Sequence, residues 1–121
     1  MEIAYWVLGG LVAAAFALTG TFKLVQTKEQ LKAKGQNWTD LYSPRAVKGI
    51  GALELLGAVG LIVPPLTGIA PWLAPVAALG LVVVMIGAAR AHLKLGETIV
   101  PNVVLGALAF ATAVVGFLVW V

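Results

Sequence analysis

Residues 102–121 read NVVLGALAFATAVVGFLVWV, a run of twenty residues without a charged side chain. A helix needs about 20 mostly apolar residues to cross a hydrocarbon core of roughly 30 Å, so this run predicts a transmembrane helix. Three other apolar runs resemble it, and the spans are expected at about residues 3–24, 46–63, 72–91 and 102–121. Helices satisfy their backbone groups within each span. We therefore expect an all-α integral membrane four-helix bundle, with residues 1–121 forming a single transmembrane domain.

The composition supports lipid as the solvent of this chain. Hydrophobic residues make up 61% of the sequence and charged residues 11%, whereas a soluble chain carries about 25% charged residues. The absence of cysteine excludes disulfides, thiol redox chemistry and thiolate-held metals within the chain. The single histidine, His92, excludes a metal site built from several histidines of one chain. The first apolar run exceeds the roughly 7–15 residues of a signal-peptide core, so we expect a retained helix.

Turn-forming residues indicate where the helices begin and end. Ser43 and Pro44 are typical of an N-cap and a first-turn proline, so they should open the second span. Pro64 and Pro65 are expected to stop that span, because proline lacks the N–H that a helix interior uses. Gly96 can adopt the left-handed conformation that ends a helix, which places the end of the third span before it.

The longest connection, residues 26–42, carries signals of its own. Thr27 and Gln30 have the spacing of a capping box, which predicts a short interfacial helix. Trp38 and Tyr42 suit the headgroup layer, where amphipathic aromatic rings gather.

The basic residues predict the orientation in the membrane. All of them flank or occupy the connections at residues 26–42 and 93–100: Lys23, Lys28, Lys32, Lys34, Arg45, Lys48, Arg90 and Lys94. Loops rich in lysine and arginine stay in the cytoplasm, so both termini should lie outside, in a multi-pass protein of the plasma or inner membrane. Membrane lipid is then the partner of these cations, and nucleic acid is not expected.

Glu54 is the one unambiguous charge inside a predicted span. It lies roughly 12 Å below the membrane boundary, counted at 1.5 Å per residue. Its helical neighbours Gly51, Gly57 and Ala58 are small, so this face should point into the bundle. Ionisable groups inside a membrane usually mark functional sites. Glu54 is therefore interpreted as a ligand anchor or proton site, or else as a structural tie between helices.

Other polar residues gather near the same membrane face. Lys23 can reach inward to Glu54 or outward to headgroups. Arg90 and His92 lie about 160° apart around their helix, so they cannot face the same way. We rank Lys23 and His92 with Glu54 as a ligand or proton site, with a second tier that consists of Glu97, Arg90 and Asn102.

Small residues recur on the helix faces, as at Gly57 and Gly87. Small side chains let helix backbones approach closely in lipid. We therefore expect both glycines at contacts between helices.

Several stretches of the sequence resemble those of the DoxX-like family of small four-span membrane proteins. The matching stretches are Thr21-Phe22-Lys23-Leu24, the segment 49–61 around Glu54, and Gly87-Ala88 followed by His92 and Gly96-Glu97. The family's namesake subunits are associated with thiosulfate:quinone oxidoreductase, and others with membrane redox complexes. The resemblance implies redox-complex partner proteins and a non-covalent quinone or other lipophilic molecule, with Lys23, Glu54, His92 and Glu97 at the family's polar positions.

Three functions are compatible with these sequence features. The first is an accessory or binding subunit associated with membrane redox chemistry, with its polar site around Glu54. The second is a small proton-coupled transporter, and the third is a purely structural membrane subunit. No nucleophile–base or metal constellation is visible, so we expect no catalytic activity of its own and no metal site. A homo-oligomer is compatible with each function.

Overall fold

The computed structural model describes residues 1–121, the whole chain. Its four long helices are α1 (Glu2–Val25), α3 (Pro44–Thr67), α4 (Leu73–Lys94) and α5 (Val100–Trp120). Two short elements, α2 (Lys28–Ala33) and the 3₁₀ helix η1 (Asn37–Leu41), lie in the connection from α1 to α3. Each of these four helices has the length and the apolar composition needed to cross a membrane. The expected all-helical fold with four candidate spans is therefore confirmed.

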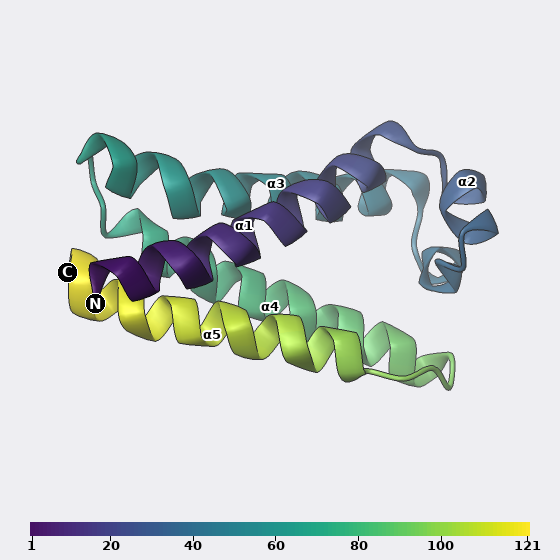
Figure 1. The fold of residues 1–121 in the computed structure, drawn as a ribbon. Coiled ribbons are helices and arrows are strands. Elements are labelled where there is room, and N and C mark those ends of the chain that lie inside the picture. The colour runs from purple at the N-terminus through teal and green to yellow at the C-terminus, as the bar shows by residue number, and fades with distance from the viewer.

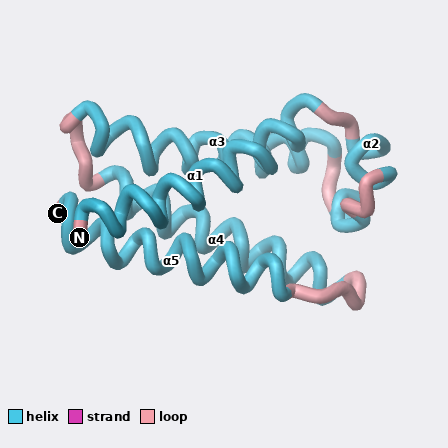
Figure 2. Tube along the Cα trace, viewed as in Figure 1, coloured by secondary structure: helices cyan, strands magenta, loops and turns pink.

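The long helices form two antiparallel pairs, α1 with α3 and α4 with α5 (Figure 1). Contacts between α3 and α4 and between α1 and α5 join the two pairs. Both termini and the α3–α4 turn lie at one end, which we call the terminal end. The α1–α3 connection and the α4–α5 turn lie at the other, the loop end (Figure 2). The two pairs diverge toward the loop end.

Local signals place most helix ends where the sequence predicts them. The Ser43 hydroxyl accepts a hydrogen bond from the Ala46 N–H at 3.1 Å, with Pro44 in the first turn of α3. Thr27 and Gln30 form both bonds of the capping box at the start of α2. Gly96 follows α4 with a φ of +70°, a conformation that a residue without Cβ adopts at little cost.

The predicted end of the second span is wrong. Instead of stopping at Pro64-Pro65, α3 continues to Thr67 and ends at Gly68, whose φ is +74°. Pro65 cannot supply an N–H to the carbonyl of Leu61, four residues earlier. The hydroxyl of Tyr5 on α1 donates a hydrogen bond of 2.6 Å to that buried carbonyl instead. A side chain from a neighbouring helix thus satisfies an acceptor that the proline leaves free.

Glycines permit close helix contacts at some of the expected places. At Gly57, a Cβ atom would lie 2.6 Å from the side chain of Leu81 on α4, so this glycine is at a helix contact as expected. Gly87 is not, because nothing lies within 4 Å of its Cβ position. The backbones of α1 and α3 also approach closely, because a Cβ on Gly20 would lie 2.7 Å from the carbonyl oxygen of Gly51.

Apolar side chains fill the core of the bundle and also cover much of its outer surface, as expected for a protein surrounded by lipid. Large apolar side chains meet at the centre of the bundle, among them Val12, Phe16 and Leu81. Large apolar side chains on the outside, such as Leu56 and Val83, are 67% exposed. These outward apolar faces are suited to lipid contact.

Candidate functional site

A cavity of about 590 Å³ lies at the loop end, where the two helix pairs diverge. All four long helices and the α1–α3 connection contribute to its walls. Its polar lining residues are Thr19, Lys23, Gln36, Tyr42, Glu54, His92, Glu97, Thr98 and Asn102, and its apolar ones include Trp38, Ile50, Met85, Ala88 and Leu105. The cavity therefore combines an apolar interior with several hydrogen-bonding groups.

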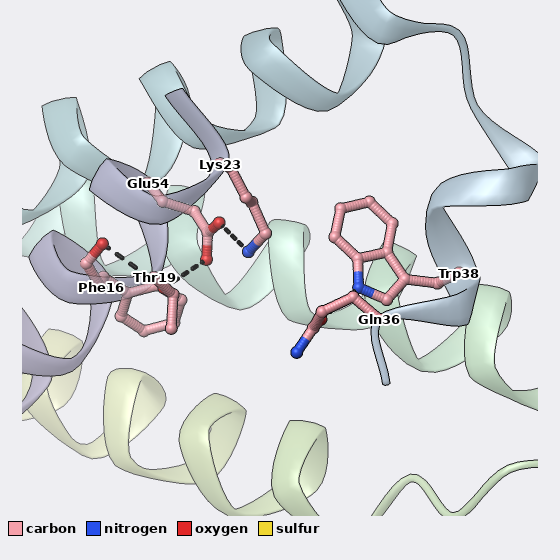
Figure 3. A network of polar contacts seen from close by, with 6 residues as sticks. All are labelled: Phe16, Thr19, Lys23, Gln36, Trp38 and Glu54. Carbon is pink, nitrogen blue, oxygen red and sulfur yellow. Dashed lines mark hydrogen bonds and ion pairs between the residues drawn. The ribbon is translucent and has the colours of Figure 1, made fainter. Parts of the chain in front are cut away.

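Glu54 and Lys23 form an ion pair on one wall of this cavity (Figure 3). The Lys23 Nζ donates to one carboxylate oxygen, and the Thr19 hydroxyl donates to the other at 3.2 Å. Glu54 is only 1% exposed, and the Lys23 side chain is 14% exposed. Glu54 therefore faces the bundle, as predicted, and of the two directions left open for Lys23 the structure shows the inward one.

The close approach of α1 to α3 explains this geometry. Gly20 and Gly51 lie at the contact, one residue after Thr19 and three residues before Glu54. Thr19 and Lys23 are four residues apart, so they share one face of α1. With the two backbones nearly touching, that face places a hydroxyl and an ammonium group beside the carboxylate.

Trp38 covers the loop-end side of the ion pair. Its ring centroid lies 5.4 Å from the Lys23 Nζ, a distance at which a cation interacts favourably with an aromatic face. The indole N–H donates to the Gln36 side-chain oxygen at 2.6 Å, and Figure 3 shows both residues beside Lys23. Trp38 is only 7% exposed, packed in a cluster with Leu31, Val47 and Ala91. Trp38 therefore packs against the protein at the loop end instead of facing outward, because η1 turns its side chain inward.

The α4–α5 turn supplies a second polar pair. The His92 Nδ1 lies 3.0 Å from a Glu97 carboxylate oxygen. The turn itself fixes this pairing, since the Glu97 N–H donates to the His92 carbonyl at 2.9 Å and Gly96 supplies the left-handed residue between them. Asn102, in the first turn of α5, lines the same cavity.

The structure thus brings together five of the six polar residues singled out in the sequence: Lys23, Glu54, His92, Glu97 and Asn102. Arg90 does not line the cavity and is exposed at a smaller recess beside it. This separation follows the angular divergence of Arg90 and His92 on α4. Sequence reasoning missed Thr19, Gln36 and Trp38 as cavity residues. Only Thr19 carried a usable signal, its spacing of four from Lys23.

A protein-family model described as the DoxX-like family matches residues 7–116. The chain belongs to the DoxX-like family. The match includes every residue that lines the cavity of this DoxX-like protein. No curated protein and no solved structure matches it.

The chemistry that this DoxX-like cavity offers is polar recognition within an apolar space. Its two carboxylates, Glu54 and Glu97, each lie against a basic side chain, Lys23 and His92. Hydroxyl and amide groups add donors and acceptors that carry no charge. No group of three or more metal-binding side chains is clustered in the structure.

Proposed function

We propose that this DoxX-like protein is an accessory subunit of membrane redox chemistry that binds a lipophilic molecule with a flat polar head, such as a quinone, in the loop-end cavity. The observation that carries the proposal is the buried Glu54 with its partners Lys23 and Thr19 in the wall of that cavity. A charged pair inside a membrane protein is costly to bury. A ligand that binds to this charged pair would explain why the pair is present despite that cost.

The size and charge of the cavity favour this class of ligand. Small-molecule sites are typically about 300–1,000 Å³, mostly apolar, with a few placed polar groups, and this cavity has about 590 Å³. Because each carboxylate is already beside a basic group, an uncharged head with hydrogen-bonding oxygens fits better than an ion. Quinone carbonyls can accept hydrogen bonds from Lys23 or His92, and Trp38 offers a flat apolar surface to the ring.

Direct binding to a quinone with a short alkyl tail tests the proposal. Wild-type protein in phosphatidylcholine nanodiscs should bind this probe saturably at one site per chain in isothermal titration calorimetry. Glu54→Gln should weaken binding by about tenfold, because the amide no longer holds the Lys23 ammonium in place, and the hydrogen bond from that charged group to a quinone carbonyl contributes about 1.5–3 kcal/mol. Leu56→Ala, a change at an outward-facing residue of the same helix, is the matched control and should bind as the wild type does.

A second variant separates ligand binding from folding. Ala88→Leu adds volume to the cavity wall and leaves the ion pair in place. It should abolish binding while circular dichroism and the melting temperature stay near those of the wild type. Heat that does not saturate, or that is equal for all these proteins, would indicate partition into lipid and contradict the proposal.

The buried carboxylate also supports proton-coupled transport, because Glu54 could exchange a proton with a substrate. This alternative predicts a proton flux when substrates are added to sealed proteoliposomes that contain a pH-sensitive dye. Binding of the quinone probe without any flux would favour the accessory role. Neither binding nor flux, together with a loss of stability in Glu54→Gln, would favour a purely structural subunit.

A further inference from the structure

A second, smaller recess of about 190 Å³ lies outside the cavity, between α4 and the end of η1. Two cations line it, Arg90 and Lys94, together with Leu41, Tyr42, Gly87 and Ala91. Arg90 and Lys94 are four residues apart on α4, so their side chains are neighbours on one helix face. The Tyr42 side chain adds a hydroxyl that can donate a hydrogen bond.

The positive charge of this recess has no protein partner. The three ion pairs of the structure are Lys23–Glu54, Lys32–Asp40 and His92–Glu97, and none includes Arg90 or Lys94. Three of the five acidic side chains are thereby engaged elsewhere. Glu2 lies at the terminal end and Glu29 is exposed on α2. The recess therefore presents two uncompensated cations to an anion from outside the chain.

The surface next to the recess is apolar and open. Gly87, one turn from Arg90, has nothing within 4 Å of its Cβ position. Beyond it on α4, Val83 is 67% exposed and Ile86 is 58% exposed. The cations thus lie at the end of a membrane-spanning helix, where lipid phosphates lie, and the apolar strip runs from them along the span.

We propose that this recess binds one anionic phospholipid. Its phosphate lies between Arg90 and Lys94, and one acyl chain follows the strip from Gly87 to Val83. Basic recesses at the cytoplasmic ends of transmembrane helices are suited to anionic headgroups. Tyr42, Gly87 and Ala91 also line the cavity, but the two cations that would hold the phosphate line only the recess, so the inference does not rest on what occupies the cavity.

Native mass spectrometry in a neutral detergent tests this site. Wild-type protein is titrated with phosphatidylglycerol or with phosphatidylcholine of the same acyl chains. We expect about thirtyfold tighter binding of the first phosphatidylglycerol, since each of the two cations near the surface contributes about 1 kcal/mol. The double variant Arg90→Gln/Lys94→Gln should bind both lipids alike. The double variant Arg45→Gln/Lys28→Gln loses the same two charges at the same end and should keep the preference.

Several outcomes would overturn the inference. Unchanged phosphatidylglycerol binding by Arg90→Gln/Lys94→Gln would show that the recess is not the site, and an equal loss in the control variant would indicate diffuse charge attraction. If sn-glycerol 3-phosphate displaced phosphatidylglycerol completely, the ligand of the recess would be a soluble anion and not a phospholipid. Should the double variant fail to fold, the wild type still provides a test in a fluorescence assay with labelled lipids. Its preference for phosphatidylglycerol should shrink at high salt, because salt screens exposed charges, and a preference that is unaffected by salt contradicts the site.

Discussion

At the scale of single residues, the hydrogen bond from Tyr5 to Leu61 replaces the bond that Pro65 cannot make. Tyr5→Phe removes the donor and leaves a buried carbonyl unsatisfied, which should lower the free energy of unfolding by about 1–3 kcal/mol. Thermal unfolding in detergent measures this loss. The Pro65→Ala background is the control, because an N–H at position 65 can serve the same carbonyl. Tyr5→Phe should cost less there, and an equal cost in both backgrounds would contradict this account.

Residue orientations were predictable only where one helix determines them. The small neighbours Gly51, Gly57 and Ala58 indicated that Glu54 faces protein, and it is 1% exposed. The divergence of Arg90 and His92 likewise follows from helix geometry alone. The direction of Lys23 and the burial of Trp38 depend on contacts between distant segments. Periodicity within one helix carries no information about those contacts.

At the scale of helices, the contact between Gly20 and Gly51 lets α1 and α3 pack closely, and these two helices form one wall of the cavity. A Cβ on Gly51 would lie 2.7 Å from Lys23 Cβ and 2.8 Å from the Gly20 carbonyl oxygen, and a backbone cannot easily move away. Gly51→Ala should therefore destabilise the bundle by about 1–3 kcal/mol, the usual cost of overpacking. Thermal unfolding in detergent is again the measurement.

Gly49 supplies the matched control for Gly51, on the same helix and two residues earlier. Nothing lies within 4 Å of its Cβ position. Gly49→Ala should leave stability unchanged or raise it slightly, because alanine favours a helix by up to about 1 kcal/mol over glycine. If Gly51→Ala were tolerated as well as Gly49→Ala, α1 and α3 would not be in this close contact.

Helix number and most helix ends were predictable because their signals are local. Ser43-Pro44, the Thr27 capping box and Gly96 all act within one turn. The end of α3 was not predictable in this way. The helix continues through Pro64 and Pro65, and the hydroxyl of Tyr5 on α1 supplies the hydrogen bond that the Leu61 carbonyl would otherwise lack. Gly87 was misplaced for a related reason. Its small size suggested a helix contact, but whether a second helix lies opposite is a property of the whole bundle.

At the scale of the whole molecule, the one-sided basic residues predict that the loop end is cytoplasmic. The chain has no cysteine, so single cysteines can report on each end. Glu29→Cys lies on α2 at the loop end, and Ile69→Cys lies at the terminal end, where Ile69 is 74% exposed. In intact cells an impermeant maleimide should label Ile69→Cys and leave Glu29→Cys unlabelled until the membrane is opened. The reverse pattern would invert the topology.

At the same scale, we propose that the loop-end cavity holds a lipophilic molecule against the Lys23–Glu54 pair. The most direct measurement is a crystal structure grown in a lipid mesophase with the short-tailed quinone present. We expect density for a flat ring beside Trp38, with a ring oxygen within hydrogen-bond distance of Lys23 or His92. An empty cavity with the quinone bound only on the outward apolar faces of the helices would contradict it.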